Sequence, residues 1–367
     1  MTIEYSQRVA RIPVYPAAAA YNLPEDVAHL ASNESPDPPL PEVVEAMDRV
    51  LRGLHRYPDP KGSALRSALS ARYGVPAERI ALGNGSCDVL LALGEALLEP
   101  GAELVYAWPS FSVYPHLEAA SGARGIRVPL NERDEHDLDA MLAEITAATR
   151  LVIVNNPNNP TATALPLAEI ATFIERVPAH VCILLDEAYI EFSTLDDPDA
   201  SLDLLRAHPN LILLRTFSKI YGLAGLRVGF ALCGSAEPVQ AVDRIRQPFF
   251  CSSVAQAAAI EALRHQDAVA ARVEQAVIAR VELGEGLREL GIEPADSQAN
   301  FLWFALPVAD GADPATVEAE VVRGLAERGV LVRAGGALGR AGWLRVSFGK
   351  PTENARFLAA LRDILGA

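Results

Sequence analysis

The chain has 367 residues, a mass of 39.3 kDa and a formal net charge of −15. Half of the residues are hydrophobic and 22% are charged, which is ordinary composition for a globular protein, and the length predicts two domains, or one domain with an elaboration. The acidic balance argues against a nucleic-acid partner, because nucleic-acid-binding proteins present basic surfaces.

The four cysteines show no Cys-x-x-Cys spacing, and Cys182 and Cys233 lie in apolar, strand-like runs. We therefore expect neither a disulfide framework nor a metal site. The N-terminus has no apolar leader segment, and no window reaches eighteen uninterrupted apolar residues, so we expect no membrane partner. The sequence predicts a cytoplasmic protein in a reducing compartment.

Residues 1–40 are rich in proline and too extended for a core, which predicts an arm over the rest of the molecule or over a neighbour. Residues 41–248 alternate apolar runs with helical patterns. The predicted strands are 79–82, 103–107, 150–155, 181–185, 211–215 and 227–233. The predicted helices between them are 87–98, 110–120, 137–147, 166–177 and 202–207. The acidic run over residues 132–139 is interpreted as a solvated loop that enters a helix.

Several of these apolar runs are continuous rather than alternating, as expected when helices cover both faces of a parallel sheet. The sequence predicts a large, doubly wound α/β domain with a mixed, mostly parallel sheet, whose ligands gather beyond the carboxyl ends of the strands. Residues 249–367 read as a smaller α+β domain. Its predicted elements are an interrupted helical stretch over 253–290, strands near 301–304, 330–333 and 343–348, and helices near 314–328 and 352–365.

The most informative stretch is residues 211–230, in which an apolar strand runs into Ser218-Lys219 and Arg227 follows eight residues after the lysine. A lysine beside a glycine-rich turn is ordinarily a solvated surface residue. Here the lysine follows a buried type of strand, where a desolvated amine can condense with an aldehyde cofactor. The hydroxyl and the guanidinium are the groups that a cofactor phosphate needs.

A second apolar strand ends in Asp186, and Tyr189 lies three positions on. An acid at that point can keep a pyridine nitrogen protonated, which makes the ring an electron sink. Alone, this segment would also suit a metal-binding acid, but no cluster of histidines or cysteines supports a metal. The two segments together predict a site for pyridoxal phosphate (PLP).

Other motifs are weaker, and each has an ordinary structural alternative. The turn with Gly85 and Ser86 opens a helix and either holds an anion or simply caps that helix. Asn159, in a turn stiffened by two prolines, either presents its amide to a ligand or belongs to a generic loop. Phe111 stacks on a planar ring or packs in the core.

Arg333 and Arg345 lie in apolar, strand-like runs near the C-terminus. A guanidinium in such a run is costly unless it is paired. An anionic group of a ligand is therefore the expected partner.

The order of these motifs resembles the fold type I PLP-dependent aminotransferases, in the branch that holds histidinol-phosphate aminotransferases and related bacterial aromatic amino acid aminotransferases. The resemblance spans nearly the whole chain. The segments that carry it are LASNESP (30–36), RYPDP (56–60), PNNPT (157–161), DEAYIEF (186–192), RTFSKIYGLAGLRVGF (215–230), SQANF (297–301) and LRVSFG (344–349).

The resemblance implies three catalytic residues, Lys219, Asp186 and Tyr189. Lys219 would condense with the cofactor and later move the proton at the substrate Cα. Asp186 would pair with the pyridinium nitrogen, and Tyr189 and Asn159 would hydrogen-bond the phenolate oxygen of the cofactor. Phe111 would stack on the cofactor ring.

The same resemblance implies that a set of side chains and backbone amides holds the cofactor phosphate: Ser218, Arg227, Gly85, Ser86 and Cys87. Tyr57 would reach the cofactor phosphate of a partner subunit, so the active site would belong to a homodimer. Arg345 would bind the substrate carboxylate, with Arg333 near an anionic tail. Tyr15 and Asn33, on the arm, would help to close the site.

The chain departs from the family pattern at two positions, Ala162, where a glycine is usual, and Cys87, in the phosphate-binding turn. The resemblance implies that histidinol phosphate is the amino donor and 2-oxoglutarate the acceptor, with glutamate as a product. The alternative donor is phenylalanine or tyrosine.

An alternative function, outside the enzymes, is that of a PLP-binding regulator or a non-catalytic relative. The sequence contains no basic helix-turn-helix region, and all expected catalytic positions are filled. A different PLP reaction, such as decarboxylation, stays open from the residues alone.

Overall fold

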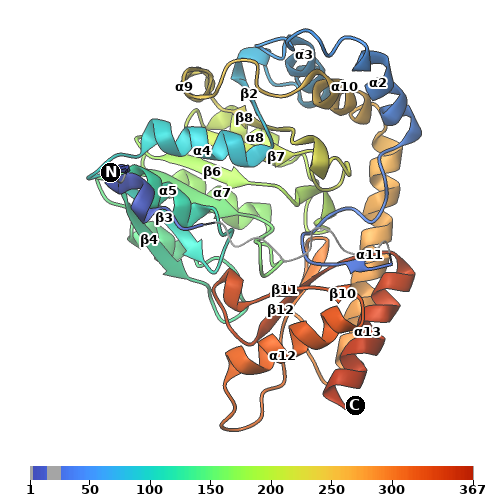
Figure 1. Cartoon of the computed structure of the whole chain (residues 1–367). Coiled ribbons are helices and arrows are strands. Elements are labelled where there is room, and N and C mark those ends of the chain that lie inside the picture. Colours follow the sequence, from blue (N-terminus) through green and yellow to red (C-terminus); the bar gives the residue numbers. More distant parts are fainter. Residues whose placement is uncertain (1–2, 15–25, 367) are drawn as a thin grey trace.

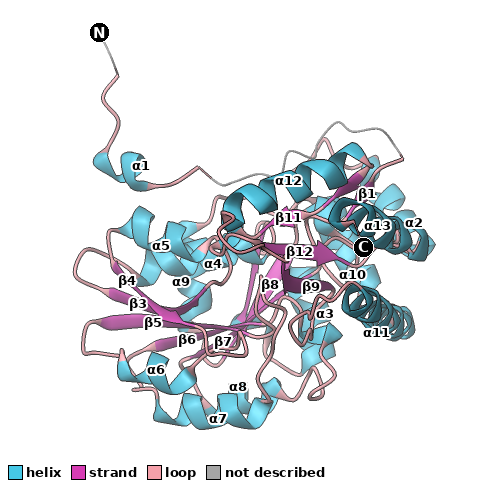
Figure 2. Ribbon diagram, turned by 90° about the horizontal axis from the view of Figure 1, so that it is seen from below, coloured by secondary structure: helices cyan, strands magenta, loops and turns pink. Residues whose placement is uncertain are grey.

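The computed structural model describes residues 3–14 and 26–366. These form a larger sheet, a smaller sheet and a separate two-stranded pair, with helices around them (Figures 1 and 2). The larger sheet has seven strands in the order β2-β8-β7-β6-β5-β3-β4. Its strands are β2 (Ile80–Gly83), β3 (Glu103–Trp108), β4 (Arg124–Pro129), β5 (Thr149–Asn155), β6 (Cys182–Asp186), β7 (Leu211–Thr216) and β8 (Gly229–Cys233).

Five neighbouring strands, β4, β3, β5, β6 and β7, are parallel, and β8 is antiparallel to both of its neighbours, β7 and β2. The predicted mixed, mostly parallel sheet is therefore confirmed. The edge strand β4 is absent from the prediction. Its sequence, RGIRVP, is mostly exposed and carries two arginines, so it lacks the continuous apolar run of a buried strand.

Helices cover both faces of this sheet, as Figure 2 shows. They are α4 (Ser86–Leu97), α5 (Tyr114–Ser121) and α9 (Glu237–Ile245) on one face, and α6 (Leu138–Ala143), α7 (Leu167–Arg176) and α8 (Ser201–Ala207) on the other. Along β5, Leu151 and Ile153 pack in the first layer, whereas Val152 and Val154 pack in the second. Both sides of the strand are buried, which explains the uninterrupted apolar sequence.

The predicted helical stretch over 253–290 is two helices, α10 (Ser253–Ala262) and α11 (Gln266–Glu289). The first packs with α2 (Pro41–Leu51) and α3 (Ser63–Tyr73), and α11 runs from this group toward the second sheet (Figure 1). The sequence-based elements include neither α2, α3 nor α9. The division of the chain into an arm, a large domain and a small domain after residue 248 stays a prediction.

The smaller sheet has the strand order β11-β12-β9 and is antiparallel. Its strands are β9 (Phe301–Ala305), β11 (Arg333–Ala334) and β12 (Trp343–Ser347), and α12 (Pro314–Glu327) and α13 (Pro351–Leu365) accompany them. From the N-terminal part, α1 (Gln7–Arg11) lies near α5, and β1 (Ala28–His29) pairs in parallel with β10 (Val330–Leu331). None of the described helices is long and apolar enough to cross a membrane.

The interpretation of residues 132–139 as a solvated loop is wrong for two of them. Asp134 and His136 are buried, at 8% and 5% exposure. The Asp134 carboxylate contacts Arg340, and the His136 ring contacts the side chain of Asn158 at 3.3 Å. Part of the acidic run is therefore buried and contacts segments that are distant in the sequence.

Candidate active site

A cavity of about 640 Å³ opens where β5, β6 and β7 end, and its wall includes residues from both sheets. This is the edge at which ligands of open α/β sheets gather. Twelve residues singled out from the sequence line it: Asn33, Ser86, Cys87, Phe111, Asn159, Asp186, Tyr189, Ser218, Lys219, Arg227, Arg333 and Arg345. The structure thus brings together nearly all of the predicted site.

Lys219 lies in the turn after β7, and its amine is directed at the backbone of the segment after β1. The Nζ atom donates to the carbonyl oxygens of Ser32, at 3.1 Å, and Asn33, at 3.0 Å. Burial, and secondly the nearby Arg345 guanidinium, lower the pKa of Lys219 to about 7. A substantial fraction of this amine is therefore neutral at physiological pH, which is the nucleophilic form.

Asp186 is the last residue of β6 and is buried. One carboxylate oxygen accepts a hydrogen bond from the Tyr114 hydroxyl at 2.9 Å, and the other from the Ala188 amide at 3.2 Å. Burial raises the pKa of Asp186 to about 6, and the carboxylate forms no salt bridge with any described residue. A buried carboxylate in this situation suits a cationic ligand group.

Tyr114 is a site residue that the sequence interpretation missed. It begins α5, three residues after Phe111, and the two rings meet edge-on at 5.7 Å. The spacing of the two aromatic residues was the available signal, because residues three apart share a face of the helix predicted over 110–120. The Tyr114 hydroxyl holds Asp186 in orientation.

A buried ion pair fixes the strand ends that carry Asp186 and Lys219. Arg215, near the end of β7, donates from Nε to Glu187 at 2.7 Å and from Nη1 to Asp199 at 2.9 Å. Arg215 and Glu187 are each 1% exposed in their side chains. The pair joins the two neighbouring strand ends, so it holds the acid and the lysine in register with each other.

The start of α4 forms a cradle with Arg227. The Arg227 guanidinium donates to Ser218 Oγ at 3.2 Å and to the Ala224 carbonyl at 3.0 Å. A Cβ atom at Gly85 would overlap this guanidinium, and one at Gly229 would overlap the backbone of Ser86. Only glycine permits this close approach. Backbone amides at a helix N-terminus beside a hydroxyl and a guanidinium suit a phosphate.

Cys87 lies on the cavity wall beside this cradle. Burial raises the pKa of its thiol to about 11. The thiol is therefore protonated at neutral pH and is a poor nucleophile.

Two arginines face the cavity from the smaller sheet. Arg333 and Arg345 are opposite each other in the pairing of β11 with β12, and both are buried. Arg345 donates to Asn159 Oδ1 at 2.6 Å and to the Ala31 carbonyl at 2.7 Å. Adjacent guanidinium groups suit a ligand that carries more than one negative oxygen.

Asn33 links the two sheets inside the site. Its side-chain Nδ2 donates to the Tyr189 hydroxyl at 3.0 Å, and its side-chain Oδ1 accepts from Ser347 Oγ at 3.0 Å. Asn33 adopts a left-handed backbone with φ of 53°. This conformation is tolerated by asparagine better than by most residues.

Three predicted residues lie elsewhere. Tyr57 is 80% exposed and stacks on Phe249 at 4.4 Å, away from the cavity of its own chain. Gly85 lies behind the wall, against Arg227. Tyr15 falls outside the described residues.

Ala162, the departure from the family pattern, is buried and has a φ of 64°. Left-handed backbone favours glycine and is unfavourable for alanine. Hydrogen bonds hold the turn on both sides, from the Ala162 amide to Asn158 at 2.8 Å and from the Gln298 amide to the Ala162 carbonyl at 2.7 Å. These hydrogen bonds hold Ala162 in the left-handed conformation.

The fold and this cavity are those of a PLP-dependent transaminase. Residues 25–361 match the family model for aminotransferases of class I and II, and the chain belongs to this family. The predictions of a fold type I aminotransferase and of PLP as the cofactor are confirmed.

Among curated relatives, the chain is 43% identical to histidinol-phosphate aminotransferase 1 of Cupriavidus pinatubonensis, over 98% of this chain and 94% of that protein. It is 46% identical to the aromatic amino acid aminotransferase of Streptomyces avermitilis, over 88% of this chain and 91% of that protein. A similar solved structure is histidinol-phosphate aminotransferase from Sinorhizobium meliloti in complex with PLP. It has 29% identity and a TM-score of 0.82, with 93% of this chain and 91% of that chain covered.

Proposed function

We propose that this transaminase transfers the amino group of histidinol phosphate to 2-oxoglutarate, giving imidazole acetol phosphate and glutamate in histidine biosynthesis. The observation that carries this proposal is the pair of buried arginines, Arg333 and Arg345, in one cavity wall. Histidinol phosphate has no α-carboxylate but has a dianionic phosphate, and 2-oxoglutarate has two carboxylates. Both molecules therefore have an anionic end that suits a pair of guanidinium groups.

The alternative donor is phenylalanine or tyrosine, and the similarity to the Streptomyces avermitilis enzyme favours it. Such a substrate would place its carboxylate against Arg345 alone. Its uncharged ring would offer no anionic group to Arg333.

The cradle, the acid and the lysine have the chemistry to hold PLP, which supplies an aldehyde carbon and an electron-withdrawing ring when bound. We propose that Lys219 holds the cofactor covalently and that Phe111 lies against its ring. The phosphate would be held by these groups: Ser218, Arg227 and the amides of Gly85, Ser86 and Cys87.

In the reaction, the Lys219 amine would act as the base that moves the proton at the substrate Cα. Asp186 would keep the ring nitrogen of the cofactor protonated. Tyr189 and Asn159 would hydrogen-bond its phenolate oxygen, and Asn33 holds the Tyr189 hydroxyl in place. Tyr15 would close the substrate end of the site.

We also propose a homodimer in which Tyr57 reaches the partner's cofactor phosphate. The exposed, stacked pair of Tyr57 and Phe249 supports this, because exposed aromatic side chains mark contact surfaces. Sedimentation equilibrium of the holoenzyme should give twice the chain mass, and a monomer that retained full activity would contradict the proposal. The cytoplasm is the location that we propose, which the four free thiols support.

A comparison of half-reaction rates tests the substrate. Histidinol phosphate and phenylalanine are each mixed with the enzyme, and the loss of the visible absorbance of the bound cofactor is followed. We expect kcat/KM for histidinol phosphate to be at least about tenfold higher, since one charged hydrogen bond contributes roughly 1.5–3 kcal/mol.

The matched variant is Arg333→Gln. It should raise the KM for histidinol phosphate by about tenfold or more and leave the KM for phenylalanine nearly unchanged. A faster reaction with phenylalanine that is insensitive to Arg333 would instead establish the aromatic alternative.

A further inference from the structure

An ion pair joins a loop of the smaller sheet to a loop of the larger sheet. Arg340, in the loop between β11 and β12, donates from Nη1 to Asp134 Oδ1 at 2.5 Å. Asp134 lies in the loop between β4 and α6 of the larger sheet. The two side chains are 36% and 11% exposed, so the pair is only partly screened by solvent.

The loop that carries Arg340 is fixed to the smaller sheet. Both oxygens of the buried Glu318 carboxylate, on α12, accept hydrogen bonds from the Gly336 amide at 3.1 Å, and one of them also accepts from Gly342 at 2.7 Å. The same loop contains Leu338, which lines the active-site cavity. Leu338, Arg340 and the two arginine-bearing strands are thus parts of one rigid unit.

The Asp134 side is equally well held. Its carbonyl accepts from Thr163 Oγ1 at 2.6 Å, its amide donates to the Asn131 carbonyl at 3.0 Å, and its φ is 60°. The carboxylate is therefore presented from a defined turn. Its position does not depend on Arg340 alone.

Close packing accompanies the ion pair. A Cβ atom at Gly339 would lie 2.9 Å from the Trp108 indole nitrogen, so the backbone of the loop rests directly on this ring. Trp108 ends β3, shortly before Phe111 on the cavity wall. On the other side, the Arg340 guanidinium lies 4.6 Å from the centre of the Trp343 ring. The contact is therefore a built junction between the two sheets.

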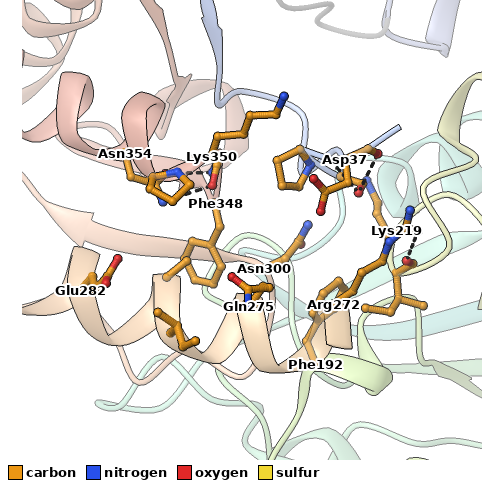
Figure 3. A pocket seen from close by; sticks show the side chains of 18 residues that line it. Asp37, Phe192, Lys219, Arg272, Gln275, Glu282, Asn300, Phe348, Lys350 and Asn354 are labelled. Atoms are coloured by element: carbon orange, nitrogen blue, oxygen red, sulfur yellow. Dashed lines mark hydrogen bonds between the residues drawn. The ribbon is translucent and has the colours of Figure 1, made fainter. Parts of the chain in front are cut away.

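A second cavity, of about 130 Å³, lies where α11 meets residues 35–37 and 349–351 (Figure 3). Lys219 is the one residue that lines both cavities. The Arg272 guanidinium at this cavity already donates to the carbonyls of Ile220 and Pro38. Neither Asp134 nor Arg340 lines this second cavity, so their ion pair is a separate contact.

We propose that Asp134 and Arg340 form a latch that positions Arg333 and Arg345 over the active-site cavity. Neither latch residue lines that cavity. Their effect on the reaction is therefore exerted through the placement of the two substrate arginines. The proposal rests on the transaminase function and on glutamate as the amino donor of the return half-reaction.

The experiment uses L-glutamate and the holoenzyme, with single-turnover loss of the cofactor's visible absorbance as the signal. Asp134→Asn and Arg340→Gln should each raise the half-saturating glutamate concentration about tenfold, as expected for a charged hydrogen bond. The limiting rate and the affinity for PLP should stay within about twofold, because the cradle and Lys219 are untouched. The double variant should be no worse than either single one.

The matched control is Arg133→Gln, which removes an ion pair with Glu135 in the same loop without touching the smaller sheet. It should bind glutamate like the wild type. Arg340→Lys keeps the positive charge, so its half-saturating glutamate concentration should lie between those of the wild type and Arg340→Gln. This comparison still holds if Arg340→Gln is less stable.

Three results would overturn the latch: unchanged glutamate binding in both single variants, additive losses in the double variant, or a parallel loss of PLP affinity. Failure of the wild type itself to react with glutamate would instead refute the proposed amino acceptor.

Discussion

Replacing Lys219 with alanine should lower kcat/KM by about 10⁴-fold or more, because one amine serves both as the covalent anchor and as the proton-transfer base. The other cations on the cavity wall are arginines, which do not deprotonate in proteins and cannot replace it. The measurement is the half-reaction with histidinol phosphate and with phenylalanine, after saturation with PLP.

The chain offers a clean control for this variant, since it contains three lysines: Lys61, Lys219 and Lys350. Lys61 and Lys350 are exposed. Borohydride reduction of the holoenzyme followed by peptide mapping should label Lys219 alone, and Lys350→Ala should keep wild-type activity. Label on either other lysine, or turnover by the Lys219→Ala variant, would refute the assignment.

The sequence was sufficient to predict the site residues whose position depends only on the local pattern of strands and turns. Asp186 and Lys219 come directly after apolar strands, and parallel strands end at one edge of a sheet, so their proximity was predictable. The buried strands were also found, because their apolar runs are uninterrupted. The exposed strand β4 lacked this signal and was missed.

Contacts between distant segments could not be predicted from local patterns. Tyr114 and Asp186 are 72 positions apart, and Asp134 and Arg340 are 206 apart. Asp134 also lies in an acidic run, and such composition favours a solvated loop. Its carboxylate instead pairs with Arg340, which only the tertiary fold brings to it.

Asp186→Asn separates the contribution of this residue to catalysis from its effect on stability. The variant is isosteric but cannot hold a ring nitrogen protonated. The rate of Cα proton removal should therefore fall by about 10²–10³-fold, the usual loss when a preorganised electrostatic group is removed. The half-reaction measured with saturating PLP and amino donor reports this loss.

The same substitution should stabilise the apoenzyme at neutral pH. Burial raises the pKa of Asp186 from 3.8 to about 6, so the folded state binds this proton more tightly than the unfolded state. The wild-type free energy of unfolding therefore falls as the pH rises from about 4 to 6, and the loss persists above pH 6. Urea unfolding at pH 7.5 should show the variant apoenzyme more stable by about 3 kcal/mol, with the difference becoming small toward pH 4.

The exposed Asp203 supplies the control, because Asp203→Asn changes a solvated carboxylate. Its effect on stability should be within about 0.5 kcal/mol at both pH values. If the difference in unfolding free energy between Asp186→Asn and the wild type did not change with pH, burial would not raise the pKa of Asp186 in the apoenzyme. The interpretation of Asp186 as a buried carboxylate that is destabilising until a cationic ring binds would then be wrong.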